Sequence, residues 1–356
     1  MKYAVLGAGN GGQAISGWLA MQGHEVWIYE IVKEKVDILA KTKQIRLQGA
    51  IEGIGQLTNV SDDIHSTVRG ANVIMVVTTA NAHAAVARDL SSDLVDGQII
   101  VLNPGRTGGA LEFRRTLDAC GCKARVYVAE AQTLIYAARL VEDGIVNIIG
   151  VKDKVLLSAV PATDTKHILE VINPDYPMFC PAKNVLRTSM ENIGAMFHPC
   201  VLLFNAATVE RNSVFWFYRD MTPKIADFIE KFDRERLAVG KAYGIDLLSV
   251  SEWISYAYPG TQGETLCEKM RNNPAYHDIK SPSTIFTRQL TEDIPTGVLP
   301  MMELGEVAGV PVPLMFSMVE ICGNLLGIDF REKGRTLGHL GLAGMSKDEI
   351  VDYLSR

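Results

Sequence analysis

Residues 1–30, which read MKYAVLGAGNGGQAISGWLAMQGHEVWIYE, decide the fold of the amino-terminal half of this chain. An apolar run, YAVL, leads directly into three glycines with the spacing G-x-G-x-x-G: Gly7, Gly9 and Gly12. The amphipathic stretch AISGWLAMQG follows the glycines, and a second apolar run, EVWIYE, ends at residue 30. Short apolar runs indicate strands and amphipathic stretches indicate helices. The segment therefore predicts a strand, a tight turn, a helix and a second strand.

Each glycine in this spacing has its own physical task in a turn that binds a dinucleotide. The first allows the tight turn from strand to helix, the second lets backbone approach a pyrophosphate, and the third lets the helix pack on the strand. The phosphates then lie at a helix N-terminus, where free N–H groups and the helix dipole favour negative charge. We therefore predict a dinucleotide site at Gly7, Gly9, Asn10 and Gly12. A glycine-rich turn without a ligand is the alternative.

Glu30 strengthens the dinucleotide prediction, because it ends the second strand eighteen residues after Gly12. The acid that binds the ribose hydroxyls of a dinucleotide is expected roughly twenty residues after the glycines. A carboxylate at this position repels a 2′-phosphate, so NAD(H) is predicted in preference to NADP(H). Lys33 and Lys35 follow closely and soften this preference, which leaves NADP(H) open.

The rest of the first half alternates short β-branched runs with helix-like stretches, the pattern of a doubly wound parallel sheet. The further strands are predicted in NVIMVVTT, QIIVLNPG and RVYVAEA, at residues 72–79, 98–105 and 125–131. Such sheets bind ligands at the carboxyl ends of their strands. Two loops fall there, TTANAH at 78–83 and NPGRTGG at 103–109. We assign Thr78 and Asn103 to the cofactor site, with ordinary turn chemistry as the alternative.

The length of 356 residues exceeds what one hydrophobic core usually serves, so two domains are predicted. After VINPDYPMFCPAKNV the sequence changes to long apolar and helical runs, such as HPCVLLFNAATVE and PKIADFIEKFDRERLAVGKAYG. We predict a Rossmann-type NAD(P)-binding domain at 1–185 and a mostly α-helical substrate and catalytic domain at 186–356. In the last helix, Ser346 and Glu349 have the spacing of a capping box.

Composition and charge narrow the class of partner and the compartment. The formal net charge is −6 and no cluster of lysine or arginine occurs, which argues against a nucleic-acid or anionic-membrane binder and favours small-molecule partners. The six cysteines show no C-x-x-C spacing, and we find neither a signal peptide nor a run of about 18 apolar residues. Reduced thiols in the cytoplasm are therefore expected. Apolar helices such as MFSMVEICGNLLG indicate either core or a homodimer interface.

A histidine suits the proton transfer that accompanies hydride transfer by a nicotinamide, because its pKa lies near neutrality. Among seven histidines, His198 stands out in ENIGAMFHPC, since a buried imidazole in this apolar segment needs a hydrogen-bonding partner. A lone histidine in apolar surroundings is also typical of a core residue. The residues alone leave both interpretations open.

Ordered motifs along nearly the whole chain resemble the opine dehydrogenase family, which includes octopine and nopaline dehydrogenases. The matching stretches lie in both halves: LGAGNGG, LNPGRTGGALEF, AEAQTL, NVLRTSMENIGAMFHP, NNPAYHDIKSPS, TEDIPTGVLP and GVPVP. The resemblance implies a catalytic dyad of His198 with Asp293, the aspartate of the E-D-I-P element. It also implies that Arg288, five residues before that aspartate, grips the carboxylate of a 2-oxo acid.

These implied roles agree with the chemistry of the side chains. An aspartate that accepts from one imidazole nitrogen fixes the tautomer and stabilises the imidazolium, and an arginine fork matches a carboxylate. A turn-forming role for Asp293 and a surface ion pair for Arg288 are the alternatives. The family places contacts to the amino acid near AEAQTL, so Glu130 and Gln132 are predicted substrate ligands. Asn192 is a further one, unless it caps a helix.

The reaction that the resemblance implies is a reversible reductive condensation that acts on a CH–NH bond. A 2-oxo acid and the amino group of an amino acid form an imine, which NAD(P)H reduces to a secondary amine dicarboxylate. His198 would exchange protons with the carbinolamine oxygen or with water, next to a nicotinamide held in a cleft between the domains.

Two other functions compete with this prediction. A dehydrogenase that acts on CH–OH, on the plan of glycerol-3-phosphate dehydrogenase or ketopantoate reductase, uses a catalytic lysine, and Lys183 is the candidate near the predicted boundary. No basic cluster that would grip a phosphate follows it. A non-catalytic NAD-binding sensor is the other alternative, because a fold alone does not prove catalysis. The joint presence of His198, Arg288 and Asp293 argues against a sensor.

Overall fold

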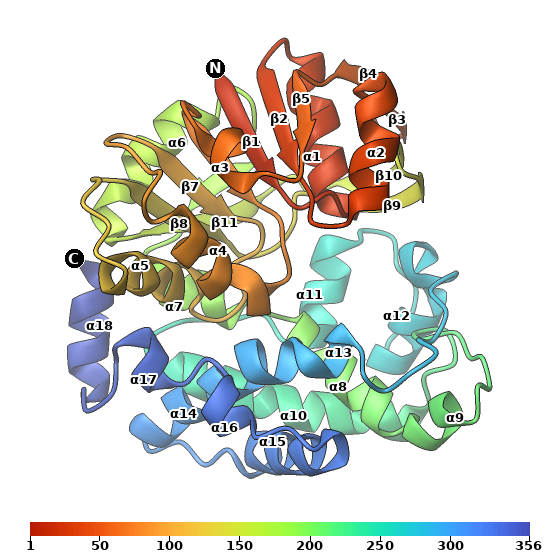
Figure 1. Cartoon of the computed structure of the whole chain (residues 1–356). Helices are drawn as coiled ribbons and strands as arrows, with labels where there is room; N and C mark the ends of the chain where they lie inside the picture. Colours follow the sequence, from red (N-terminus) through yellow and green to blue (C-terminus); the bar gives the residue numbers. More distant parts are fainter. The chain divides into compact units, whose positions relative to one another are not determined.

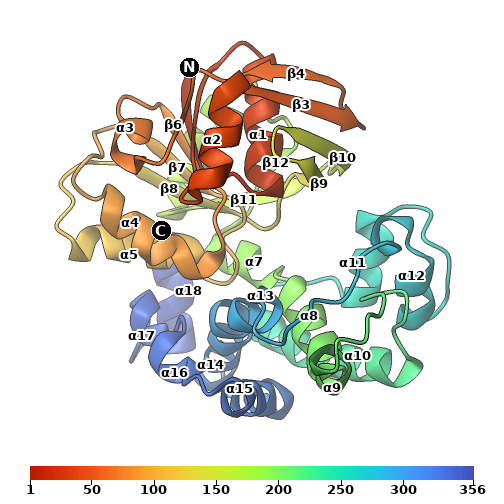
Figure 2. The ribbon, with the colours of Figure 1, turned by 45° about the vertical axis from the view of Figure 1, so that its right-hand side comes forward.

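The computed structural model describes residues 1–356, and the chain divides into two compact units (Figure 1, Figure 2). Unit 1 comprises Met1–Ser189 together with the last residues, Tyr353–Arg356, and unit 2 comprises Met190–Asp352. The boundary that the sequence predicts, at 185, lies four residues before this division.

Unit 1 is built on an eight-stranded sheet whose strand order reverses beside β1. In spatial order its strands are β12 (Phe179–Pro181), β11 (Val155–Val160), β8 (Tyr127–Ala131), β7 (Ile99–Leu102), β6 (Val73–Val76), β1 (Lys2–Leu6), β2 (Glu25–Tyr29) and β5 (Asn59–Ser61). Neighbouring strands run parallel except β11, which is antiparallel to β8. The predicted Rossmann-type sheet is confirmed, and its switch point lies at the carboxyl ends of β1 and β6.

The central strands are apolar throughout because helices cover both faces of the sheet. All four residues of β6, VIMV, and of β7, IIVL, are buried. The helices of unit 1 are α1 (Asn10–Met21), α2 (Lys33–Thr42), α3 (Ile64–Val68), η1 (Ala80–Ala82), α4 (His83–Leu90), α5 (Gly109–Ala119), η2 (Ala162–Asp164), α6 (Thr165–Ile172) and α7 (Val185–Met190). The connections through α1 and α2 lead to strands on one side of β1, and those through α4 and α5 lead to strands on its other side. Because both sets of connections are right-handed, α1 and α2 lie on one face of the sheet and α4 and α5 on the other (Figure 1).

A second, four-stranded sheet in unit 1 has no counterpart in the sequence analysis. Its order is β4 (Gly53–Gln56), β3 (Gln44–Gly49), β10 (Ile145–Val151) and β9 (Tyr136–Glu142). One face of this sheet packs closely on α1, since a Cβ on Gly17 would lie 2.9 Å from side-chain carbons of both Ile45 and Leu47. The strands were missed because β3 and β4 contain glycine and several polar residues and pair with a hairpin far along the chain.

Unit 2 is helical, as the sequence predicts. Its helices are α8 (Gly194–Leu203), α9 (Ala206–Glu210), α10 (Pro223–Ala242), α11 (Val250–Ala257), α12 (Leu266–Asn272), η3 (Pro274–Tyr276), α13 (Arg288–Thr291), η4 (Ile294–Val298), α14 (Leu299–Val307), α15 (Pro313–Leu326), α16 (Phe330–Lys333), α17 (Leu337–Leu340) and most of α18 (Lys347–Ser355). The long helix α10 packs with α14 and α15 (Figure 2). The element η4 is one turn of π-helix, a form that is rare and often found at functional sites.

The predicted capping box of the last helix is present. The Glu349 carboxylate accepts from Ser346 N at 2.7 Å, and Glu349 N donates to Ser346 Oγ at 3.4 Å. No single helix of the chain has the length and apolar composition that crossing a membrane requires, although α15 and residues 330–340, bent by 103°, meet that test as a pair.

Candidate active site

The glycine turn between β1 and α1 has the geometry that its spacing predicts. Gly7 adopts a φ of +104°, which favours glycine, and its N–H donates to Tyr29 O at 2.9 Å. A Cβ on Gly12 would lie only 1.7 Å from Gly7 O, so only glycine lets α1 pack this closely on the turn. A Cβ on Gly9 would meet no protein atom within 4 Å. Gly9 thus borders the open space into which a pyrophosphate fits.

The Glu30 carboxylate lies beside this turn and accepts hydrogen bonds from backbone N–H groups. Its Oε2 accepts from Ala8 N at 2.9 Å, inside the glycine motif, and its Oε1 accepts from Ile31 N at 2.9 Å and Val32 N at 3.0 Å. An ionised carboxylate offers about four lone-pair positions, so further donors such as ribose hydroxyls fit the same group. Its negative charge at this point disfavours a 2′-phosphate.

The other predicted cofactor residues occupy the same edge of the large sheet. Asn10 starts α1, and its Oδ1 accepts from Leu140 N at 2.8 Å, which ties the helix to β9. Thr78 and Asn103 follow β6 and β7, and their side-chain oxygens are buried without a hydrogen-bonding partner. Asn103 Nδ2 donates to Val101 O at 2.9 Å. Buried oxygens without a partner are uncommon in proteins, so this edge is suited to a ligand that brings donors.

The residues present therefore fit a dinucleotide. The open space at Gly9, the N-terminus of α1 and the Glu30 carboxylate together provide room for phosphates and an acceptor for ribose hydroxyls.

A short segment after β8 covers the start of α1. Leu134 lies against Gly11, where a Cβ would be 2.9 Å from Leu134 Cδ2. Lys152 Nζ donates to Leu134 O at 2.7 Å and holds the segment in place. Burial lowers the pKa of Lys152 from 10.5 to about 8, because the surroundings disfavour its charged form.

The predicted dyad is assembled within unit 2. His198 lies inside α8, and Asp293 lies directly before η4, ninety-five residues further along the chain. His198 Nδ1 is 2.6 Å from Asp293 Oδ2, a charge-assisted distance, and the two side chains are 19% and 1% exposed. His198 Nε2 forms no hydrogen bond with the protein, so this nitrogen is the one available to a substrate. A carboxylate on Nδ1 orients the ring in the tautomer that leaves Nε2 as acceptor.

Aromatic and small residues hold this pair in position. The His198 ring lies 6.1 Å from that of Phe217 and 6.5 Å from that of Tyr218. On the other side, a Cβ on Gly297 would lie 2.7 Å from Ala195 Cβ and 2.9 Å from Asn192 Nδ2. Glycine in η4 therefore allows the π-helical turn to approach α8. Asn192, predicted as a substrate ligand, is buried beneath this turn.

Arg288 begins α13, just before the dyad aspartate. Its side chain is 59% exposed, and its nearest acidic group is Glu292 Oε2 at 3.9 Å, too long for a strong bidentate pair. The guanidinium fork thus retains donors for a carboxylate ligand.

Glu130 and Gln132, predicted as substrate ligands, are engaged within unit 1. Gln132 Oε1 accepts from Leu156 N at 3.1 Å and extends the pairing of β8 with β11. Glu130 accepts hydrogen bonds from Thr188, Ser189 and the backbone of α5. Thr188 and Ser189 were missed from the sequence, where two adjacent hydroxyl residues carry no specific signal.

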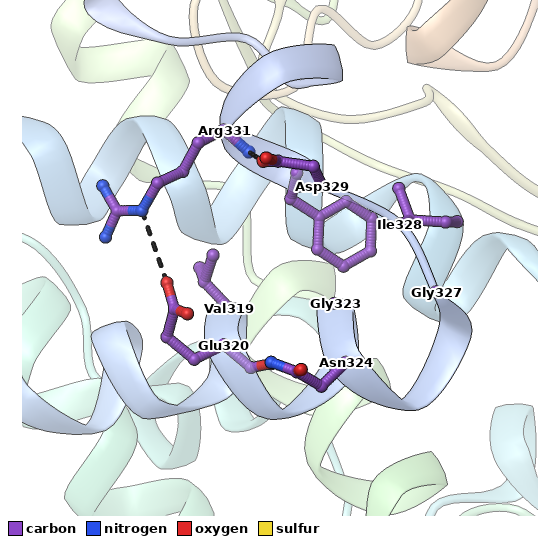
Figure 3. A pocket seen from close by; sticks show the side chains of 9 residues that line it. Val319, Glu320, Gly323, Asn324, Gly327, Ile328, Asp329 and Arg331 are labelled. Atoms are coloured by element: carbon purple, nitrogen blue, oxygen red, sulfur yellow. Dashed lines mark hydrogen bonds and ion pairs between the residues drawn. The ribbon is translucent and has the colours of Figure 1, made fainter.

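Two other places lack a histidine paired with a buried carboxylate. Lys183, the candidate of the alternative CH–OH reaction, is exposed and forms no hydrogen bond or ion pair. A cavity of about 360 Å³ is lined by α15, the turn after it and α16 (Figure 3). Its charged side chains include Glu320 and Arg331, which pair with each other at 3.3 Å, and it contains no histidine.

Comparison with protein families gives one match in each half of the chain. Residues 181–326 match the family model described as NAD/NADP octopine/nopaline dehydrogenase, alpha-helical domain. Residues 2–104 match the model described as the N-terminus of NAD-dependent glycerol-3-phosphate dehydrogenase.

Individual relatives extend over nearly the whole chain. The "Opine dehydrogenase" of Arthrobacter sp. (strain 1C) is 36% identical and covers 97% of this chain and 96% of its own length. The "Vitopine synthase" of Allorhizobium ampelinum is 26% identical, with 99% of each chain covered.

Solved structures share the fold at lower identity. Octopine dehydrogenase with NADH and L-arginine gives a TM-score of 0.79 at 21% identity, over 99% of this chain and 98% of that one. Yersinopine dehydrogenase with NADP⁺ gives 0.71 at 13% identity, over 99% and 97%. A ketopantoate reductase from Ralstonia eutropha gives 0.62 at 18% identity, over 94% and 99%.

Proposed function

Because this chain belongs to the opine dehydrogenase family, we propose that it reductively condenses a 2-oxo acid with the amino group of an amino acid, using NAD(P)H. The single observation that carries the proposal is the contact of His198 with Asp293, which presents a free imidazole nitrogen in the helical unit. The chain is thus an NAD(P)-dependent oxidoreductase, and the bond formed and reduced is a C–N bond.

The reaction needs a group that moves protons and a source of hydride. A bound dinucleotide would supply the hydride, and the Gly7–Gly12 turn and Glu30 would hold that dinucleotide. Forming the imine releases one water, which requires a proton on the carbinolamine oxygen. His198 Nε2 delivers this proton, and Asp293 stabilises the charge on the ring while it is protonated. In the reverse direction the same nitrogen takes a proton from the attacking water.

Arg288 binds the carboxylate of the 2-oxo acid. Its exposed fork can form two parallel hydrogen bonds with a carboxylate, which fixes the orientation of the carbonyl carbon. Asn192 and Gln132 remain the proposed contacts to the amino acid.

NAD(H) is the preferred cofactor in this proposal, since the Glu30 carboxylate lies beside the turn, and NADP(H) stays open. The functional domains are proposed at 1–185 and 186–356. We further propose that the enzyme acts in the cytoplasm on small molecules and forms a homodimer.

The test is NADH oxidation with a panel of 2-oxo acids, each with and without a panel of amino acids. We expect oxidation only when both substrates are present, and a secondary amine dicarboxylate as the product. Oxidation with a 2-oxo acid alone would favour the CH–OH reaction. In that case Lys183→Met should abolish activity, whereas the proposed function expects this exposed lysine to be dispensable. NADH binding without any turnover would favour a sensor.

A further inference from the structure

Glu130 lies near the carboxyl end of β8 and exposes none of its surface. Moving an ionised carboxylate from water into a protein interior is costly unless hydrogen bonds replace its hydration. The bonds that Glu130 makes therefore account for its burial.

Both carboxylate oxygens accept hydrogen bonds from segments distant in sequence. Oε1 accepts from Thr188 Oγ1 at 2.6 Å and from Ser189 Oγ at 2.9 Å, and Oε2 accepts from Ala110 N at 2.8 Å. Ala110 is the second residue of α5, where backbone N–H groups have no partner within the helix. The positive end of the helix dipole also favours a carboxylate there.

A second set of bonds connects the same partners to the loop after β7. Ser189 Oγ accepts from Gly108 N at 2.9 Å, and Thr107 Oγ1 donates to Ser189 O at 3.2 Å. A Cβ on Gly105 would lie 2.5 Å from both Cβ and Oε2 of Glu130, so glycine is needed to admit the glutamate. The motifs NPGRTGG, AEA and TSM of the sequence are thus one packed structure.

This structure fixes an unusual backbone at the ligand edge of the sheet. Arg106, in the middle of the loop, has a φ of +60°, a conformation that is uncommon for non-glycine residues. The two residues that follow Arg106, Thr107 and Gly108, are held by Ser189, and Glu130 anchors Ser189 in turn.

We propose that Glu130 is a positioning residue rather than a substrate ligand. Its carboxylate joins loop 103–109, the first turn of α5 and residues 188–189, and so sets where Asn103 and Arg106 lie at the edge of the sheet where the cofactor is proposed to bind. The inference rests on the proposed function, because turnover is one of its readouts. Amide exchange supplies a readout that does not depend on activity.

The test is Glu130→Gln. The amide has a single oxygen, so it can accept either from the two hydroxyls or from Ala110 N, but not from both sides. Hydrogen–deuterium exchange at the Gly108 and Ala110 amides should become at least about tenfold faster, whereas the peptide over the glycine turn at 7–13 should be unchanged. We expect kcat to fall by about 10- to 100-fold, as for a displaced reacting geometry. The Kd of NADH, measured by fluorescence, should change by less than about twofold.

Ser189→Ala is the second variant, in case Glu130→Gln does not fold. It removes the acceptor of Gly108 but leaves the bond to Ala110, so only Gly108 should exchange faster, again with a lower kcat. Glu170→Gln, an exposed glutamate of α6, is the matched control and should leave every quantity unchanged.

Three results would overturn the proposal. Unchanged exchange in Glu130→Gln would show that the carboxylate anchors nothing. Faster exchange with unchanged kcat would show that the anchoring does not serve the reaction. A raised KM for one substrate at unchanged kcat would make Glu130 a ligand. If the wild-type protein turns over no substrate pair, the proposed function fails, while the exchange data still decide whether Glu130 anchors the loop.

Discussion

Replacing Asp293 by asparagine tests the core of the proposed mechanism. The substitution keeps the size of the side chain, and asparagine fits the same 1% exposed position, so the fold should be retained. It removes a carboxylate that lies 2.6 Å from His198 Nδ1. The amide can also turn its NH₂ toward Nδ1, which would shift the ring proton to Nε2 and leave the wrong tautomer for accepting a proton.

The expected loss of turnover in Asp293→Asn follows from this geometry. The variant loses a charge-assisted hydrogen bond and the stabilisation of the imidazolium in a nearly buried position. A positioned acid–base system contributes about 10²- to 10⁴-fold to turnover, which corresponds to about 3 to 5 kcal/mol of transition-state stabilisation. The residues proposed to bind the dinucleotide lie in unit 1, so the Kd of NADH should not change.

The assay is steady-state NADH oxidation at saturating 2-oxo acid and amino acid, with the Kd of NADH measured in parallel. Asp278→Asn is a matched control, because Asp278 also contacts a histidine, His277, at 2.9 Å but is 86% exposed. We expect that variant to retain wild-type turnover. A turnover of Asp293→Asn within about threefold of wild type would refute the dyad, and His198 would then be a core histidine with a buried partner.

Three further predictions concern the cofactor, the 2-oxo acid and stability. Glu30→Ala should weaken NADH binding by about tenfold and narrow the preference over NADPH, since the ribose hydroxyls lose an acceptor worth about 1.5 kcal/mol; equal Kd values before and after would remove Glu30 from the site. Arg288→Ala should raise the KM of the 2-oxo acid by about 10- to 100-fold, from the loss of about 1.5–3 kcal/mol of charged hydrogen bonding, and a defect confined to the amino acid would reassign the residue. Lys152→Met should stabilise the protein at pH 7 by about 1–2 kcal/mol, because its native pKa of about 8 lies below the unfolded value of 10.5 and the gain exceeds the lost bond to Leu134 O. Between pH 8 and 10.5 the unfolded state binds more protons at Lys152 than the folded state does, so the stability of the wild type rises with pH. The extra stability of Lys152→Met should therefore shrink over this range. If urea denaturation gives the same difference in unfolding free energy between variant and wild type at every pH, the shifted pKa is contradicted.

The dinucleotide turn could be predicted because its physics is local. Gly7, Gly9 and Gly12 lie within six residues, and the strand, turn and helix that they join are consecutive. A Cβ added to Gly12 would clash with Gly7, whereas a Cβ added to Gly9 would meet no protein atom. Both results agree with the roles that the spacing predicts for these glycines. The capping box at Ser346 was predictable for the same reason, since its two partners are three residues apart.

The dyad could not be derived from spacing. His198 and Asp293 are ninety-five residues apart, and their pairing was expected only because the motifs resemble a family. The apolar segment around His198 fits a core histidine equally well until the contact is seen. The close approach of α8 and η4 depends on Gly297, and no sequence pattern indicates this role of the glycine.

The sequence by itself determined the parallel sheet, the glycine turn, the acid at the end of β2 and the helical character of the second half. Only the tertiary structure decided the second sheet, the burial of Asn192 beneath η4 and the bonds of Glu130 with α5 and Ser189. Propensity and capping act between residues a few positions apart and leave a periodic pattern. A buried carboxylate instead takes its donors from wherever packing brings them, and no local pattern records which segments those will be.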